Sequence, residues 1–356
     1  MSKLDEFIEI DGSFLESGGQ ILRTSLSLSA SLQKPFKIKN IRAKRAKPGL
    51  QAQHLTAVKA CAEVCGARVA GDALHSTQLC FSPANFSPGS YSFDIGTAGS
   101  VFLVLQTLLP IACFAHEGTK ISLSGGTENH FAPTSFYFQK AFLPPVEKLG
   151  VRASVEVKQF GWYPKGGGKV VAQIAAAKKL SAINLVERGE LKQLTGFSAT
   201  SNLPPHVRER MKTRALKQLS ENSFQAKIGL LELPAIGQGA ELFLLPEYSG
   251  AGAAGFVALG ELGKPAEKVA GEAIHNFLEF HKTGAAVDAH LADQLLLYCA
   301  LATGKSAYSV EKITSHLLTN AFVVKQFLPE CEVKIEGKQG EAGVVGVEGI
   351  GFSPTR

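Results

Sequence analysis

The segment Leu15–Arg23 carries residue types suited to binding an anion beside a metal ion. It reads LESGGQILR, so two glycines precede an apolar run that predicts a helix. Glycines at a helix start leave backbone N–H groups open to an anion, and Arg23 lies about one turn into the helix. Glu16, in the preceding loop, is a type of residue that holds divalent cations. The alternative is an ordinary helix start with Glu16 and Arg23 on the surface.

A basic loop follows, and its residue types suit phosphate. Four Lys or Arg residues lie within the six positions Arg42–Lys47. The guanidinium groups of Arg42 and Arg45 offer phosphate two parallel hydrogen bonds each. Gln53 and His54, at the start of the next predicted helix, add polar groups on the same side. The alternative is a solvated basic loop.

Two segments near the C-terminus place a histidine near a helix start. In HLADQ, the spacing of His290, Asp293 and Gln294 puts them on one helix face. His316 follows Ser315, which we expect to cap the helix of SHLLTNAFVVKQFL. The positive end of a helix lowers the pKa of a histidine and keeps its imidazole neutral, as a nucleophile requires. A packing or surface role is the alternative for each histidine.

A run of three glycines occurs in Trp162–Lys169, WYPKGGGK, between two predicted strands. Such a run predicts a tight turn or a close backbone approach, with a phosphate cradle as the second option. It is not a Walker loop, because no Gly-Lys-Ser/Thr runs into a helix. The chain also lacks HExxH, GxSxG, CxxC and protein-kinase motifs, which excludes those common chemistries.

The elements that position these residues alternate between short strands and amphipathic helices. A β-α-β-α-β-β pattern of about 85 residues occurs twice, and a third begins near SAINLVERG. From about 187 to 280 the pattern changes and includes a strongly basic helix, after which helices and strands resume. The sequence therefore predicts an α/β (α+β) fold of three βαβαββ units with a small α/β domain inserted in the third. We expect residues 1–186 and 281–356 to form the core, and 187–280 the inserted domain.

Composition limits the class of protein. Of 356 residues, 45% are hydrophobic and 19% charged, which excludes disorder, and the net charge of +6 allows a polyanionic partner. The longest apolar stretch, Val101–Ala115, is interrupted by polar residues and too short for a membrane span. Six scattered cysteines predict free buried thiols, and the acidic N-terminus is unlike a signal peptide. These features favour an intracellular protein, cytoplasmic or, in a eukaryotic source, nuclear.

Several segments, in this order, resemble the RNA 3′-terminal phosphate cyclases: FLESGGQILRTSLSLS, IRAKRAKPGLQAQHLTAVKA, GTAGSVFLVLQTLLP, SGGTEN, GWYPKGGG, LADQL and SHLLTN. The resemblance runs nearly end to end and is weakest in the inserted domain. It implies units like those of the enolpyruvyl transferases, and a reaction that uses ATP and Mg²⁺ or Mn²⁺. A histidine takes AMP from ATP, and the AMP passes to an RNA 3′-phosphate to form RNA(3′)pp(5′)A. The neighbouring 2′-hydroxyl then displaces AMP and leaves a 2′,3′-cyclic phosphate.

The resemblance also implies a role for each matching residue. His316 corresponds to the adenylated histidine, and Glu16 to the carboxylate that holds the metal. The residues matching the nucleotide site are Gln106, Pro133, His290, Asp293 and Gln294. The residues matching the site of the RNA phosphate are Arg23, Arg42, Arg45, Gln53 and His54.

The chain departs from the family pattern at three positions. His290 stands where a tyrosine packs on adenine, Phe160 where a basic residue is usual, and Glu128 in a segment that often reads TDN. The alternative function is a non-catalytic, cyclase-like factor in RNA binding or ribosome assembly, a type of relative that has lost the nucleophile. Enolpyruvyl transfer, a third option, would not call for the nucleophile that His316 offers. The sequence sets neither the physiological RNA nor the oligomeric state.

Overall fold

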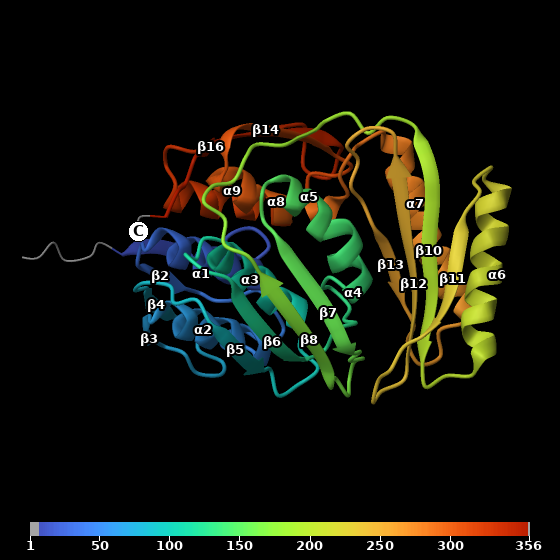
Figure 1. Ribbon diagram of the computed structural model, residues 1–356, viewed down its shortest axis with the longest axis horizontal. Coiled ribbons are helices and arrows are strands. Elements are labelled where there is room, and N and C mark those ends of the chain that lie inside the picture. The colour runs from blue at the N-terminus through green and yellow to red at the C-terminus, as the bar shows by residue number, and fades with distance from the viewer. Residues whose placement is uncertain (1–6, 355–356) are drawn as a thin grey trace, which may run out of the picture.

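The computed structural model describes residues 7–354, and this part of the chain forms four four-stranded sheets (Figure 1). Of the N-terminal segment for which we expect no signal peptide, residues 1–6 lie outside the described range. Three of the sheets belong to units of one topology. The first unit comprises β1 (Ile8–Asp11), α1 (Gly19–Leu32), β2 (Phe36–Lys39), α2 (Ala52–Cys65), β3 (Arg68–Ala70) and β4 (Leu79–Ser82).

The second unit repeats this succession. It comprises β5 (Ser90–Asp94), α3 (Val101–Cys113), β6 (Thr119–Gly125), α4 (Ser135–Tyr137), a π-helical turn (Phe138–Phe142), α5 (Leu143–Lys148), β7 (Ala153–Gln159) and β8 (Gly168–Ile174). The third comprises β9 (Asn184–Leu185), α8 (Ala289–Leu301), β14 (Thr303–Val310), α9 (Ser315–Phe327), β15 (Glu332–Glu336) and β16 (Gly343–Ile350).

Strand pairing shows that the three units are equivalent. The sheet orders are β1-β2-β4-β3, β5-β6-β8-β7 and β9-β14-β16-β15. In each sheet the first two strands are parallel and the remaining pairs are antiparallel. Each parallel pair is joined through a helix, as such pairs require.

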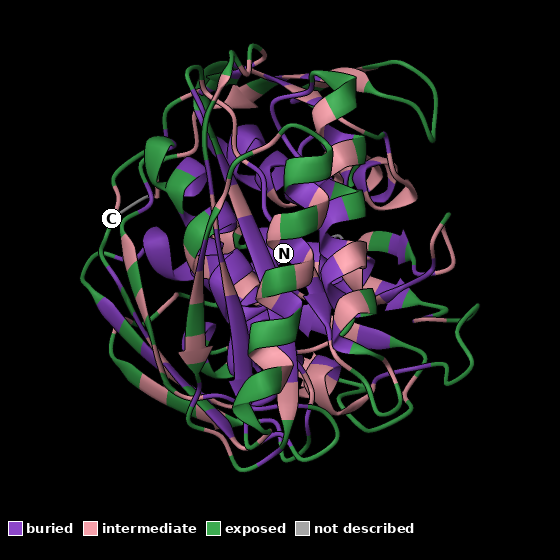
Figure 2. Ribbon diagram, turned by 90° about the vertical axis from the view of Figure 1, so that its right-hand side faces the viewer, coloured by how far each residue is buried: buried purple, intermediate pink, exposed green. Residues whose placement is uncertain are grey.

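The fourth sheet and two helices lie between β9 and α8 in the chain. They are β10 (Leu191–Ser201), α6 (Pro205–Glu221), β11 (Lys227–Glu232), β12 (Gly239–Tyr248), β13 (Phe256–Leu259) and α7 (Ala266–Thr283), with sheet order β11-β10-β12-β13. This β10–α7 unit has its own apolar core, which includes Met211 and Phe277. Its helix α6 turns a largely exposed face outward (Figure 2). The predicted fold class, three βαβαββ units with an α/β domain inserted in the third, is confirmed.

Two predictions about helices need correction. Ser315 is the first residue of α9 and not its cap, because the Thr314 hydroxyl accepts the hydrogen bond from the Leu317 N–H. The sequence also predicts one regular helix from Phe136 to Gly150, but the structure widens it into a π-helical turn at its centre. Pro144 and Pro145 follow that turn, and they lack the N–H groups that a regular helix would use there.

The helices converge at the centre of the molecule. Helix α1 packs against α9, α3 and α2, and α8 packs against α9, so helices of all three units meet there. The interior is apolar, and the six cysteines are free, five of them buried and Cys80 half-buried, as predicted. No helix of the described chain combines the length and apolar character needed to cross a membrane.

Candidate active site

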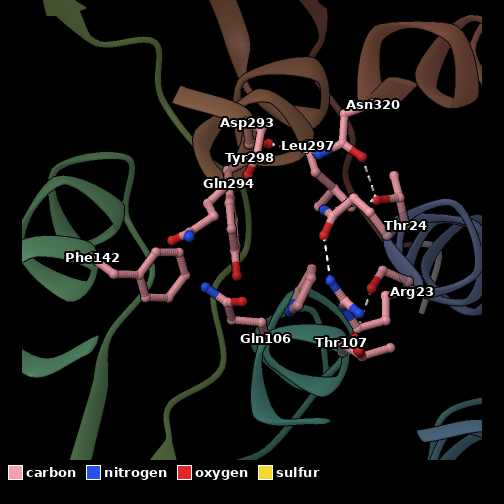
Figure 3. A pocket seen from close by; sticks show the side chains of 13 residues that line it. Arg23, Thr24, Gln106, Thr107, Phe142, Asp293, Gln294, Leu297, Tyr298 and Asn320 are labelled. Atoms are coloured by element: carbon pink, nitrogen blue, oxygen red, sulfur yellow. Dashed lines mark hydrogen bonds between the residues drawn. The ribbon is translucent and has the colours of Figure 1, made fainter. Parts of the chain in front are cut away.

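A polar pocket lies where α1, α3, α8 and α9 converge (Figure 3). Its wall includes four of the predicted residues, Arg23, Gln106, Asp293 and Gln294, which come from all three units. The cavity between them is small, about 40 Å³, so a nucleotide base could enter only after wall side chains had moved. The repeat therefore brings residues distant in sequence to one place.

Three polar atoms in this wall have no hydrogen-bond partner in the described chain. They are Gln106 Nε2 on α3 and, on α8, Gln294 Oε1 and the Tyr298 hydroxyl. A buried polar group left unpaired costs about 1–3 kcal/mol of stability. Atoms of this kind in a pocket are suited to a ligand that offers both donors and acceptors, as a nucleotide base does.

Asn320 ties the helices around the pocket together. Its Oδ1 accepts a hydrogen bond from the Thr24 hydroxyl of α1 at 2.8 Å, and its Nδ2 donates to the Asp293 carbonyl of α8 at 2.9 Å. Burial raises the pKa of the Asp293 carboxyl to about 8, although the nearby Arg23 guanidinium opposes the shift. The carboxyl is therefore largely protonated at neutral pH and can donate a hydrogen bond.

Glu16, Arg45 and His316 form a second cluster. The Glu16 side chain is 9% exposed; it forms an ion pair with Arg45, and its Oε1 lies 3.6 Å from His316 Nε2. Neither carboxylate oxygen makes a hydrogen bond within the described chain. A Cβ added to Gly18 would overlap this carboxylate, so glycine at the start of α1 makes room for it.

The environment keeps His316 neutral at neutral pH. Burial lowers the pKa of its imidazole to about 4, and the positive charges of Arg23, His290 and Arg45 add to the shift. The nearby Glu16 carboxylate is itself ion-paired with Arg45. The side chain remains 43% exposed and reachable by a substrate. A neutral, accessible imidazole nitrogen is the form that acts as a nucleophile.

His54 lies against the start of α1 in a similarly positive setting. Burial lowers the pKa of its imidazole to about 3, with further contributions from Arg23 and Arg42. Its Nδ1 accepts a hydrogen bond from the Gln51 N–H, and its Nε2 lies so near Gly19 that an added Cβ would overlap it. The predicted Gly-Gly opening of α1 thus lets His54 and Glu16 approach the backbone of the helix start.

The remaining predicted residues lie at the periphery or take part in local structure. Arg42 Nη1 donates to the carbonyl oxygens of Lys47 and Gly49 within its own loop. Gln53 Oε1 accepts from the Ser100 N–H at the start of α3. His290 is exposed in the first turn of α8, and Pro133 is buried between β6 and α4; neither lines the pocket. His290, Asp293 and Gln294 lie within α8 at the spacing that places them on one helix face, and of the three only Asp293 and Gln294 line the pocket.

Sequence reasoning missed the other residues that line the pocket, among them Thr24, Tyr298 and Asn320. Helical spacing could have indicated two of them. Asn320 is four residues after His316, and Tyr298 is four residues after Gln294, so each shares a helix face with a predicted residue.

The donor set fits a weakly held Mg²⁺ or Mn²⁺ and not a metal held by protein ligands alone. Within residues 7–354 no three His, Cys, Asp or Glu side chains are grouped to hold a metal. Glu16, however, presents two carboxylate oxygens without hydrogen bonds, of which Oε1 is ion-paired with Arg45. Mg²⁺ is commonly held by one or two carboxylates together with water and substrate phosphates. Glu16 meets that requirement.

Comparison with known proteins identifies the family. The family model described as RNA 3′-terminal phosphate cyclase matches residues 14–335. This chain belongs to the RNA 3′-terminal phosphate cyclase family. A protein of that name from Nostoc punctiforme is 46% identical over 90% of this chain and 94% of its own length. Another protein of that name, from Pyrobaculum neutrophilum, is 44% identical over 97% of this chain and 99% of its own length.

A solved structure of EPSP synthase from Acinetobacter baumannii also matches the cyclase-family chain. The match covers 98% of this chain and 83% of the EPSP synthase chain, with 11% sequence identity and a TM-score of 0.29. The assignment of the repeat fold therefore relies on the strand orders and connections given above. The family resemblance inferred from the sequence motifs is confirmed.

The contrast between Gln294 and Asn320 generates a prediction about stability. Gln294→Met removes a polar atom that has no partner, so thermal stability should stay the same or rise. Asn320→Leu, similar in volume, removes two hydrogen bonds and should lower the free energy of unfolding by about 2 kcal/mol. Thermal denaturation followed by circular dichroism measures both variants. A loss on Gln294→Met as large as that on Asn320→Leu would contradict the assignment of Gln294 as an unpaired, ligand-facing residue.

Proposed function

We propose that this chain converts RNA 3′-phosphate ends to 2′,3′-cyclic phosphates in an ATP-dependent reaction, through a covalent histidine–AMP intermediate. Family membership supports the cyclase reaction. The observation that carries the mechanism is His316, a neutral and accessible imidazole placed between Glu16 and a group of arginines. A non-catalytic RNA-binding relative would have no need for this arrangement.

In the first step the lone pair of His316 Nε2 attacks the α-phosphorus of ATP. The bond from that phosphorus to the bridging oxygen breaks, and pyrophosphate leaves. Arg23 and Arg45 offset negative charge on the phosphates as the bond forms. A divalent cation held by Glu16 would supply further charge neutralisation. Gln106, Asp293 and Gln294 are proposed to hold the nucleotide, with Pro133 and His290 at its edge.

In the second step an oxygen of the RNA 3′-phosphate attacks the phosphorus of the histidine adduct, which releases His316 and forms RNA(3′)pp(5′)A. The 2′-hydroxyl oxygen then attacks the 3′-phosphorus, AMP leaves, and the hydroxyl proton is lost to solvent. Arg42, Gln53 and His54, with Arg23 and Arg45, are proposed to orient the RNA phosphate. Holding the reacting groups together makes the last step intramolecular.

Labelling with ATP tests the nucleophile. Incubation with α-labelled ATP and Mg²⁺ or Mn²⁺ should give a protein–AMP adduct that is labile in acid and stable in base. His316→Ala should abolish the adduct, whereas His275→Ala, at an exposed histidine on α7, should keep it. An adduct that persists in His316→Ala would refute the assignment and direct attention to His54 and His290.

The low pKa of His316 predicts an unusual pH profile. Because the folded pKa of about 4 is below the ordinary value, the imidazole stays neutral well below pH 6. The second-order rate of self-adenylation at low ATP, which reports the free enzyme, should change less than about twofold between pH 8 and pH 5.5. An ordinary histidine with a pKa near 6.5 would lose about tenfold over that range. Circular dichroism at each pH controls for unfolding.

The RNA end group tests the order of the steps. An oligonucleotide ending in a 3′-phosphate should be cyclised, and one ending in a 3′-hydroxyl should be inert. A 3′-phosphate on a terminal 2′-deoxy sugar should accept AMP and stop there, because the attacking oxygen is missing. Mass spectrometry distinguishes the products. If the deoxy end accepts no AMP while the ribose end is cyclised, AMP transfer itself requires the 2′-hydroxyl and the proposed order is wrong.

A further inference from the structure

A second and much larger hollow, the interunit cleft, separates the second unit from the β10–α7 unit. Its volume is about 1110 Å³. One wall consists of the loop 128–131 after β6 and the turn 162–165 between β7 and β8, and the other includes Val207, Met211 and Leu262. Figure 1 shows the β7–β8 end beside the β11–β12 connection, which the pairing of Phe160 with Ala235 confirms. Neither the proposed nucleotide pocket nor the Glu16 cluster includes these residues.

The cleft displays aromatic rings that nothing in the described chain covers. The Phe131 side chain is fully exposed and Tyr163 is 71% exposed, while Leu262 on the opposite wall is also fully exposed. Phe131 has φ +61°, a left-handed conformation that is unfavourable for a bulky aromatic residue. Exposed apolar side chains gathered at a hollow mark a binding surface, and a strained backbone at the same place supports a function there.

The polar residues of the cleft suit a nucleic acid. Lys165 is exposed and forms no ion pair within the described chain, so it is free to meet a phosphate. Glu261, an exposed carboxylate of the wall, is 3.5 Å from His130. Asn129 Oδ1 is buried without a partner and can accept a hydrogen bond from a base. Proteins that bind single-stranded nucleic acid without sequence preference stack the bases on aromatic side chains and place cationic side chains near the phosphates.

Hydrogen bonds to one short segment link the cleft to the group proposed to hold the RNA phosphate. Gln53 Oε1 accepts from the Ser100 N–H, and two residues earlier the Ala98 carbonyl accepts from Asn129 Nδ2 at 2.6 Å. Gly166, in the β7–β8 turn, packs on the same Ala98 backbone. The segment 97–100 therefore has Gln53 on one side and the cleft on the other. A single-stranded RNA whose 3′ end lies at Gln53 can extend across this segment into the cleft.

We propose that the interunit cleft binds the single-stranded RNA that precedes the terminal phosphate, with bases stacked on Phe131 and Tyr163 and a backbone phosphate near Lys165. The inference rests on the proposed function, because it assigns a path to the same substrate. The volume exceeds what a single small ligand needs, which suits more than one nucleotide. A protein partner, the other type of occupant, would have no reason to connect with the phosphate site.

Oligonucleotides of two lengths test the proposal. Enzyme already carrying AMP is mixed with a dinucleotide or a decanucleotide that share the same 3′-phosphate end, and AMP transfer is measured against RNA concentration. Wild-type enzyme should show a lower KM for the decamer. The double variant with Phe131→Ala and Tyr163→Ala should raise the KM for the decamer at least about thirtyfold, the smallest loss expected from two stacking contacts, and remove the preference for length. A variant that combines Phe131→Ala with Tyr163→Phe keeps an aromatic ring at position 163. Its KM for the decamer should lie between that of wild type and that of the double variant.

A control variant and a cross-link complete the test. Leu230→Ala, at an exposed apolar residue of β11 outside the cleft, should behave as wild type. A photoreactive uridine a few nucleotides from the 3′ end should cross-link to peptides containing Phe131 or Tyr163. Equal KM values for the two lengths in wild type, or an unaffected double variant, would overturn the proposal and leave the cleft to a protein partner. Absence of transfer to either length would instead refute the proposed function, and this inference with it.

Discussion

The site depends on one buried carboxylate shared by two basic groups. Glu16 forms an ion pair with Arg45 and lies 3.6 Å from His316, so one carboxylate lies between the basic loop of the first unit and the start of α9 in the third. Glycine at position 18 leaves room for the carboxylate, because a Cβ there would displace the end of the Glu16 side chain from this position. The loop before α1, the basic loop and the start of α9 are therefore constrained together, although about 300 residues separate Glu16 from His316 in the chain.

The repeat explains how such distant segments meet. Three units with the same strand order direct their helices toward one centre, and the pocket takes α1 from the first, α3 from the second, and α8 and α9 from the third. Asn320 then fixes the spacing, because its amide bonds to both α1 and α8. The units share a topology but not their residues, so the pocket is asymmetric and each helix supplies a different group.

Much of this could be predicted from the sequence, because periodicity and glycine placement are local signals. They revealed the three units and the helix that opens at Gly18, and motif order revealed the family. The π-helical turn at Phe138–Phe142 was missed, since its cause is a pair of prolines within an otherwise helical pattern. The cap at Thr314 was placed one residue late, because Ser is the better N-cap by residue type and Ser315 directly follows Thr314. Asn320 and the cleft around Phe131 depend on contacts between units, which no local pattern encodes.

Burial selects which groups in the site carry charge. It lowers the pKa of His316 to about 4 and of His54 to about 3, and it raises the pKa of Asp293 to about 8, so all three are mainly neutral at neutral pH. Burial also lowers the pKa of Arg23, but only to about 10, and this residue stays protonated. The charges that remain are guanidinium groups, opposed by Glu16. The same desolvation thus keeps the His316 imidazole neutral while the arginines around it stay charged, and a positive field of this kind favours ligands that carry several negative charges.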